Sequence, residues 1–133
     1  MLTSATTLAA QVEEALLRRN APLKAFFNRE APRLAIASSQ MSERFLKGGR
    51  LLAFGRGPYA TDAQHVSVEF VHPVIVGKRA LPALDLSMMF TQALDVLLQP
   101  EDIVMGFGPP EGDPEVEAPL ARAERNGAMT FAL

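Results

Sequence analysis

The feature that most constrains this sequence is a short apolar run, Leu51 to Phe54, which contains no polar residue and ends at Gly55. A strand with one face in water alternates polar and apolar residues, whereas a strand of a parallel sheet is buried on both faces and is apolar throughout. After a short loop, Thr61-Asp-Ala-Gln64 matches the capping box that opens a helix. The run therefore predicts the first strand and first crossover of a parallel α/β sheet.

The alternation of predicted strands and helices continues to the last residue. Further apolar segments are strand candidates, over residues 81–86, 103–107 and 129–133. Helices are predicted between the strands, over about 61–72, 88–98 and 114–126. The last helix has Asp113 as its N-cap, Pro114 in its first turn and Gly127 at its end. We expect an α/β fold, a Rossmann-like parallel sheet of about four strands flanked by helices.

Helical periodicity dominates the residues before this core. Pro22 and Pro32 suit the first turn of a helix better than its interior. We therefore expect an amphipathic segment before Pro22, a short helix over about 22–30 and a longer one over about 32–47 that ends at Gly48-Gly49. One domain of 133 residues follows, with N-terminal helices over 1–49 and an α/β core over 50–133.

Apolar residues in the N-terminal segment recur at helical spacing. They could pair with their equivalents in a second copy, or pack on the chain's own sheet: Leu8, Val12, Leu16, Phe26, Phe27 and Leu34. Pairing would cover apolar surface that a small sheet leaves open. We expect a homodimer or a homotetramer.

Composition excludes several classes of protein. The chain has no cysteine, so it has no disulfide framework, zinc ribbon or thiolate nucleophile, and any metal would need His, Asp or Glu ligands. A net charge of −2 gives no basic surface for nucleic acid. No apolar run reaches the roughly 20 residues of a membrane span, and the first residues lack the basic start of a secretory signal. We expect a cytoplasmic protein that acts on neither nucleic acid nor membrane.

The loop after the first strand is the first candidate site, because open α/β sheets bind ligands at the carboxyl ends of their strands. Its two glycines allow a close approach of the backbone, and the next helix begins with free N–H groups that favour an anion. The candidate ligand-binding residues are Gly55, Arg56, Gly57, Tyr59 and Asp62. A tight turn without a ligand is the alternative explanation.

The following helix carries a second candidate site. His65 and Glu69 are four residues apart and share one face, which can place an imidazole and a carboxylate on one metal ion or one substrate. His72 lies seven residues beyond His65, on the same stripe if the helix is intact there. An ordinary surface pair between His65 and Glu69 is the alternative.

A family resemblance bears on both sites. Lys47 to Glu69 resembles the opening of a sugar isomerase (SIS) domain of the phosphoheptose isomerase type, in which a K-G-x-K strand leads into G-N-G-G-S-x-x-D-A-x-H-x-x-x-E. Later stretches are similar to the family's L-P-A-I-A-L, G-D-V-L-I-G-I and A-A-x-x-x-G-M-x-x-I-A-L segments: Leu81–Leu86, Glu101–Gly106 and Ala121–Leu133.

The resemblance implies a Rossmann-like sheet, N-terminal helices used in oligomerisation and a phosphosugar site between subunits. It also implies that His65 and Glu69 belong to a metal-binding active site, with zinc as the metal to test. Glu69 would be the base that moves a proton between carbons 1 and 2 of a ketose phosphate of the sedoheptulose 7-phosphate type, with His65 beside it.

Departures from the family pattern predict altered chemistry. In the first loop, Arg56 and Pro58-Tyr59 replace the family's Asn and Ser. The family's S-T-S-G-N-S phosphate loop is replaced by Gly106 to Glu115, which is rich in proline and acid. Prolines offer no N–H donor, and acidic side chains already favour the helix N-terminus. At an effective dielectric of about 20, each uncompensated carboxylate about 4 Å from a phosphate charge costs on the order of 4 kcal/mol.

Two segments of the family pattern are also absent from the sequence. Ser87 to Pro100 is shorter than the family's connection, and no closing helix with a glutamine and a second histidine follows Leu133. We therefore expect a degenerate, non-catalytic phosphosugar-binding or protein-interaction module. The alternative is an active sugar-phosphate isomerase whose site is completed by another subunit, since a base acts best with an acid partner.

Overall fold

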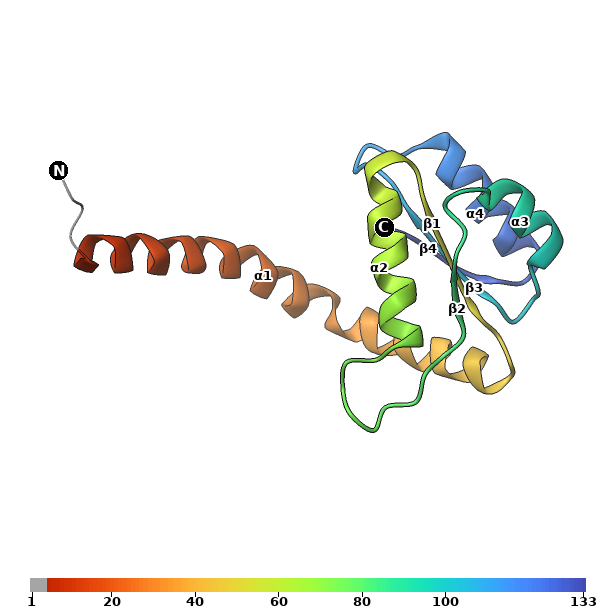
Figure 1. Cartoon of the computed structure of the whole chain (residues 1–133), viewed down its shortest axis with the longest axis horizontal. Helices are drawn as coiled ribbons and strands as arrows, with labels where there is room; N and C mark the ends of the chain where they lie inside the picture. Colours follow the sequence, from red (N-terminus) through yellow and green to blue (C-terminus); the bar gives the residue numbers. More distant parts are fainter. Residues whose placement is uncertain (1–4) are drawn as a thin grey trace. The chain divides into compact units, whose positions relative to one another are not determined.

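A computed structural model describes residues 5–133 of the chain (Figure 1). They divide into two compact units, one up to Ser39 and one from Gln40 to Leu133, which are described separately. Helix α1 spans Ala5–Leu46, so its last turns belong to the second unit. The boundary between N-terminal helices and core that we placed at residue 49 stays a prediction.

The first unit consists of α1 as far as Ser39. The helix runs through Pro22 and Pro32, so the prediction of separate helices over 22–30 and 32–47 is wrong. A proline removes one backbone hydrogen bond and crowds the carbonyl four residues earlier. Good helix formers on both sides of each proline, such as Leu23 and Arg33, let the helix continue.

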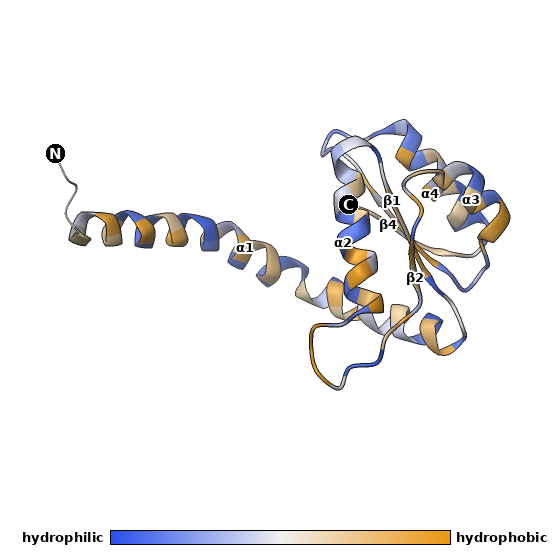
Figure 2. Cartoon of the chain, in the orientation of Figure 1, coloured by the Kyte–Doolittle hydropathy of each residue, from blue (hydrophilic) through white to orange (hydrophobic). Residues whose placement is uncertain are grey.

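The face of α1 on which apolar residues recur is exposed, and Figure 2 shows hydrophobic and hydrophilic residues alternating along the helix. Glu30 forms ion pairs with Arg29 (2.6 Å) and Arg33 (3.0 Å). The hydrogen bond from Arg29 holds the pKa of Glu30 below its usual value. Among the described residues, no helix is both long and apolar enough to cross a membrane.

The second unit is built on one parallel sheet with the strand order β2-β1-β3-β4. The strands are β1 (Leu51–Gly55), β2 (Ala83–Asp85), β3 (Ile103–Phe107) and β4 (Met129–Ala132). All three pairings are parallel. The predicted α/β fold with a four-stranded parallel sheet is confirmed. Since β1 lies beside β3, with Gly55 opposite Phe107, the loops that follow these two strands are neighbours.

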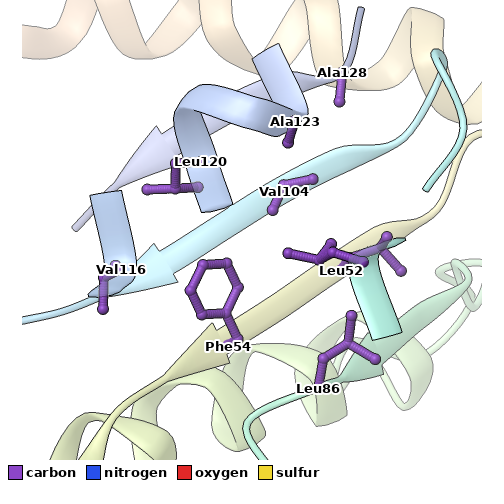
Figure 3. Close-up of a cluster of buried hydrophobic side chains, with 9 residues drawn as sticks. Leu52, Phe54, Leu86, Val104, Val116, Leu120, Ala123 and Ala128 are labelled. Carbon is purple, nitrogen blue, oxygen red and sulfur yellow. The ribbon is translucent and has the colours of Figure 1, made fainter. Parts of the chain in front are cut away.

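Helices cover both faces of the sheet (Figure 1). They are α2 (Ala60–Val71), α3 (Phe90–Leu97) and α4 (Pro114–Arg125), with a short 3-10 turn, η1 (Gly57–Tyr59), before α2. On one face Leu52, Phe54 and Val104 pack against α3 and α4, as Figure 3 shows for Val116 and Leu120 of α4. On the other face, the sheet packs against α2 and the last turns of α1.

The helix ends confirm the predicted Asp113 cap and Gly127 stop and contradict the predicted capping box at Thr61. Asp113 caps α4 as predicted, because its carboxylate accepts a hydrogen bond from the Glu115 N–H. Gly127 follows the end of α4 with a φ of 92°, a conformation that favours glycine. The predicted capping box at Thr61 is wrong: the Thr61 hydroxyl donates to the Pro58 carbonyl (2.7 Å), because η1 leads directly into α2.

A buried ion pair joins the amino ends of β1 and β3. The Asp102 side chain is fully buried and accepts hydrogen bonds from Nε and Nη2 of Arg50 at 3.1 and 2.7 Å. It also accepts from the backbone N–H groups of Arg50 and Gln99. The hydrogen bond to Asp102 raises the pKa of Arg50 above its usual value. These contacts fix the register of the two central strands at their starting end.

Candidate functional site

The candidate site lies at the carboxyl edge of the sheet, where two loops meet. The first loop, residues 56–59, joins β1 to α2, and the second loop, residues 108–113, joins β3 to α4. Gly55 closes β1 and permits a tight first loop, because a Cβ at Gly55 would lie 2.3 Å from the Tyr59 carbonyl oxygen. Gly57 has a φ of 55°, which favours glycine.

Arg56 connects the two loops. Its guanidinium pairs with Asp113 through Nη1 at 2.9 Å and with Glu115 through Nη2 at 3.1 Å. The Arg56 side chain is 43% exposed and that of Asp113 only 16%, so water reaches the pair from the arginine side. The cation that we predicted to bind a ligand is therefore held by two carboxylates of the chain itself.

The amide of Gly55 is also engaged. Its N–H donates to the Ser87 hydroxyl oxygen (3.1 Å), and that hydroxyl donates to Asp85 (2.6 Å). The Ser87 N–H donates to the same carboxylate oxygen (3.0 Å). The end of β2 thus holds the start of the first loop, and the amide at this turn is not free to bind an anion.

Five backbone N–H groups in and after the second loop form hydrogen bonds within the chain. The Gly108 N–H donates to the Leu133 carbonyl, and the Gly112 N–H donates to the Pro109 carbonyl, each at 2.9 Å. In the first turn of α4, three N–H groups donate to the carboxylate or carbonyl of Asp113: Glu115, Val116 and Glu117. An anion at this helix N-terminus would have to displace Asp113.

Two further carboxylates lie at the second loop. Glu117 folds back over Gly112, where its Oε1 would contact a Cβ built on that glycine. Glu111 is exposed at the loop itself. Within residues 5–133, neither carboxylate forms an ion pair. Beside them is a hollow of about 460 Å³, lined by Pro109, Pro110 and Val116 among others. The second loop is therefore an acidic rim around an apolar hollow.

The remaining predicted site residues lie on or beside α2. Asp62 is exposed in the first turn of α2, and Tyr59 packs partly against the core face formed by β1 and β3. His65 Nε2 lies 3.7 Å from Glu69 Oε1, and both side chains are exposed, by 76% and 43%. His72 lies beyond α2, which ends at Val71. It therefore does not share a helix face with His65 and Glu69.

His65 and Glu69 alone provide two ligands for a zinc ion. A catalytic zinc site uses three protein ligands and a water molecule. In the part of the chain that the structure describes, no three His, Cys, Asp or Glu side chains are grouped to hold a metal. The described residues of one chain therefore do not fit a complete zinc site.

Sequence reasoning missed two parts of this edge. It did not pair Arg56 with Asp113, since the two residues are 57 positions apart. Finding this pair would have required a prediction that the strands over 51–54 and 103–107 are neighbours, and the sequence pattern does not fix the order of the strands. It also missed the Asp85–Ser87 contact to Gly55, for which a polar pair directly after an apolar strand was the available signal.

Comparisons with known proteins agree on one family. A phosphoheptose isomerase of Pelobacter propionicus is 32% identical over 118 residues, which are 77% of this chain and 62% of that protein. A phosphoheptose isomerase of Solidesulfovibrio magneticus is 30% identical over 142 residues, which are 95% of this chain and 68% of that protein. No family model matches the sequence.

Solved structures show the same fold. The phosphoheptose isomerase of Neisseria gonorrhoeae superposes with a TM-score of 0.75 at 18% identity, covering 95% of this chain and 74% of that one. The phosphoheptose isomerase of Francisella tularensis gives a TM-score of 0.74. Against curated relatives, the chain spans 62% of the Pelobacter propionicus protein and 58% of one from Desulfovibrio desulfuricans.

Proposed function

The chain belongs to the phosphoheptose isomerase family, and we propose that it is a member whose carboxyl-edge site holds a protein partner and does not turn over a sugar phosphate. The observation that carries this proposal is the ion-paired second loop. Asp113 and Glu115 hold Arg56 at 2.9 and 3.1 Å, and Asp113 also occupies the N-terminus of α4.

Energetics support the same conclusion. A phosphate at the second loop would meet Glu111 and Glu117, which Arg56 does not pair. Each uncompensated carboxylate costs on the order of 4 kcal/mol at about 4 Å and an effective dielectric of about 20. An amide donor returns only about 0.5–1.5 kcal/mol net, and the amides in the first turn of α4 already bond to Asp113. A ligand with cationic groups and an apolar body suits this edge better than a phosphosugar does.

Assembly is part of the proposal. The apolar residues of α1 are exposed, including Leu8, Val12 and Phe27. Burying them against a second copy would stabilise a homodimer or a homotetramer through apolar contact. Light scattering at micromolar concentration is expected to give the mass of two or four chains, and the mass of one chain would contradict this part.

A turnover assay tests the function. The purified protein is incubated with sedoheptulose 7-phosphate, with and without added zinc, and the product is followed by NMR. We expect no conversion, and no thermal stabilisation by the sugar phosphate at millimolar concentration. Conversion that is abolished by Glu69→Gln would overturn the proposal and identify an active isomerase.

A second candidate function is an isomerase whose site is completed by another subunit. The observation that favours it is the pair His65 and Glu69, which lie 3.7 Å apart on an exposed face of α2 that a neighbour could reach. An imidazole and a carboxylate on one face can move a proton if an acid partner is supplied. The assay above decides between the two, since this candidate requires conversion by the assembled protein.

A further inference from the structure

A loop at the amino ends of the strands, opposite the second loop, complements the second loop in charge and in apolar character. We propose that the second loop of one copy receives the basic loop of another copy, residues 74–79, so that Lys78 and Arg79 of that copy meet Glu111 and Glu117. This inference rests on the proposed function, because it names the protein partner as a second copy of the same chain.

The basic loop has an apolar tip. It lies between α2 and β2 and is closed by a turn in which the Lys78 N–H donates to the Ile75 carbonyl (3.1 Å). Gly77 in this turn has a φ of 85°. The three residues before Gly77 are apolar and exposed: Val74 by 81%, Ile75 by 65% and Val76 by 101%. Figure 2 shows this loop as a hydrophobic stretch followed by a hydrophilic one.

Charge in the basic loop is uncompensated. Lys78 and Arg79 follow the tip directly and are exposed. Neither forms an ion pair with any residue that the structure describes. No acidic residue occurs between Glu69 and Asp85. The loop therefore presents three aliphatic side chains beside two cations, in a chain whose net charge is −2.

The second loop presents the matching features. Its hollow of about 460 Å³ is lined by Pro109, Pro110 and Val116, which are apolar. Glu117 also lines the hollow, Glu111 lies in the loop between the lining residues Pro110 and Gly112, and both glutamates are exposed. Two carboxylates beside an apolar hollow complement two cations beside an apolar tip. Such complementarity directs which surfaces associate, while the apolar contact adds affinity.

Geometry allows the contact to form twice. The basic loop precedes the amino end of β2, whereas the second loop follows the carboxyl end of β3. In a parallel sheet these ends lie at opposite edges, as Figure 1 shows. Two copies that lie antiparallel about a two-fold axis would each place a basic loop on the other's second loop. A two-fold dimer repeats every contact in this way.

An anionic lipid surface could also attract the basic loop. It would leave the acidic second loop without a partner, whereas a second copy provides partners for both loops at once. We therefore favour the second copy, and vesicle binding becomes an outcome of the test.

Charge reversal tests the pairing. One variant carries Lys78→Glu and Arg79→Glu, and the other carries Glu111→Lys and Glu117→Lys. In each variant alone, both contacts of the dimer bring like charges together. In a mixed dimer, both contacts bring opposite charges together. We expect the 1:1 mixture to associate about tenfold or more tightly than either variant alone, measured by sedimentation velocity.

Matched controls isolate the effect. A variant with Lys47→Glu and Arg125→Glu has the same change in net charge at other exposed positions. Its mixture with the Glu111→Lys, Glu117→Lys variant is expected to show no such gain. If the reversed pair associates no better in the mixture than apart, the proposal is wrong. Binding of the wild-type chain to vesicles with 30% anionic lipid, lost in the Lys78→Glu, Arg79→Glu variant, would also overturn it.

Cross-linking provides a second readout that does not depend on the strength of association through α1. The chain has no cysteine, so single cysteines can be placed by Val76→Cys in one copy and Pro110→Cys in another. A short bismaleimide should link the mixed copies, while Val76→Cys with Glu124→Cys, at the other end of α4, in the second copy serves as the unlinked control. An absent Val76–Pro110 link overturns the inference even if the chain is a dimer.

The two proposals fail separately. Turnover of a sugar phosphate would overturn the proposed function, whatever the charge-reversal result. A failed charge reversal together with no turnover would leave the proposed function in place and reject the second copy as the partner.

Discussion

Two arginine–aspartate pairs bracket the same two strands, and they differ in burial. Arg50 and Asp102 lie before β1 and β3, and Asp102 is fully buried. Arg56 and Asp113 lie after the same strands, and the arginine is 43% exposed. The buried pair is enclosed by backbone donors and has a structural role. The exposed pair lies at the carboxyl ends of the strands, which is where open α/β sheets bind ligands.

The largest effect is expected at the buried pair. Asp102→Ala removes the acceptor of two backbone N–H groups and the carboxylate that pairs with the Arg50 guanidinium, which keeps its hydrogen bond to the Leu97 carbonyl. Breaking a buried pair by removing one partner costs about 3–5 kcal/mol of unfolding free energy. Urea denaturation followed by circular dichroism measures this loss. A loss below about 1 kcal/mol would remove the distinction between the two pairs.

Two substitutions of Asp113 should separate its role as the N-cap of α4 from its role in the ion pair with Arg56. Asp113→Ala removes the cap of α4 and is expected to cost about 0.5–2 kcal/mol of stability. Asp113→Asn keeps an oxygen that can accept from the Glu115 N–H, so its cost should be smaller. The same denaturation experiment compares the two variants. Equal losses in both would mean that the ion pair, not the cap, stabilises this end.

The exposed pair itself should contribute little to stability. Arg56→Gln is expected to cost about 0.2–1 kcal/mol, because water screens an ion pair at 43% exposure. The difference between wild type and variant should shrink further in high salt. A cost as large as that of Asp102→Ala, measured in the same buffer, would show that burial does not separate the pairs.

The smallest effect is expected on α2. Glu69→Gln removes a 3.7 Å contact between two exposed side chains. Such helix pairs are worth about 0.3–0.5 kcal/mol, so the thermal midpoint should hardly move. Glu43→Gln, on an exposed face of α1, is the control. A clearly lower thermal midpoint for Glu69→Gln but not for Glu43→Gln would show that Glu69 has a structural role beyond its contact with His65.

The central strands and α4 were predictable because their signals are local. The apolar runs at Leu51 and Ile103 follow from burial on both faces, and Asp113 with Pro114 marks a helix start whatever surrounds it. Pro22 and Pro32 misled the prediction, because the penalty of a proline competes with a long run of good helix formers.

The site was less predictable than the fold. The acidic character of the second loop was evident from the sequence, but its pairing with Arg56 depends on β1 lying next to β3. The Arg50–Asp102 pair depends on the same adjacency at the other end. Contacts between residues more than 50 positions apart follow from the order of strands, which local patterns do not fix.

The most direct test measures whether the carboxylates of Asp113 and Glu115 prevent Arg56 from binding an anion. Inorganic phosphate is titrated calorimetrically into the wild-type chain and into Asp113→Asn, Glu115→Gln, with Glu43→Gln, Glu124→Gln as the control. We predict no saturable binding by the wild type or the control, and measurable binding once Arg56 is released. Equal phosphate binding by the wild type and by the Asp113→Asn, Glu115→Gln variant, including no binding by either, would contradict the proposal that these carboxylates block Arg56.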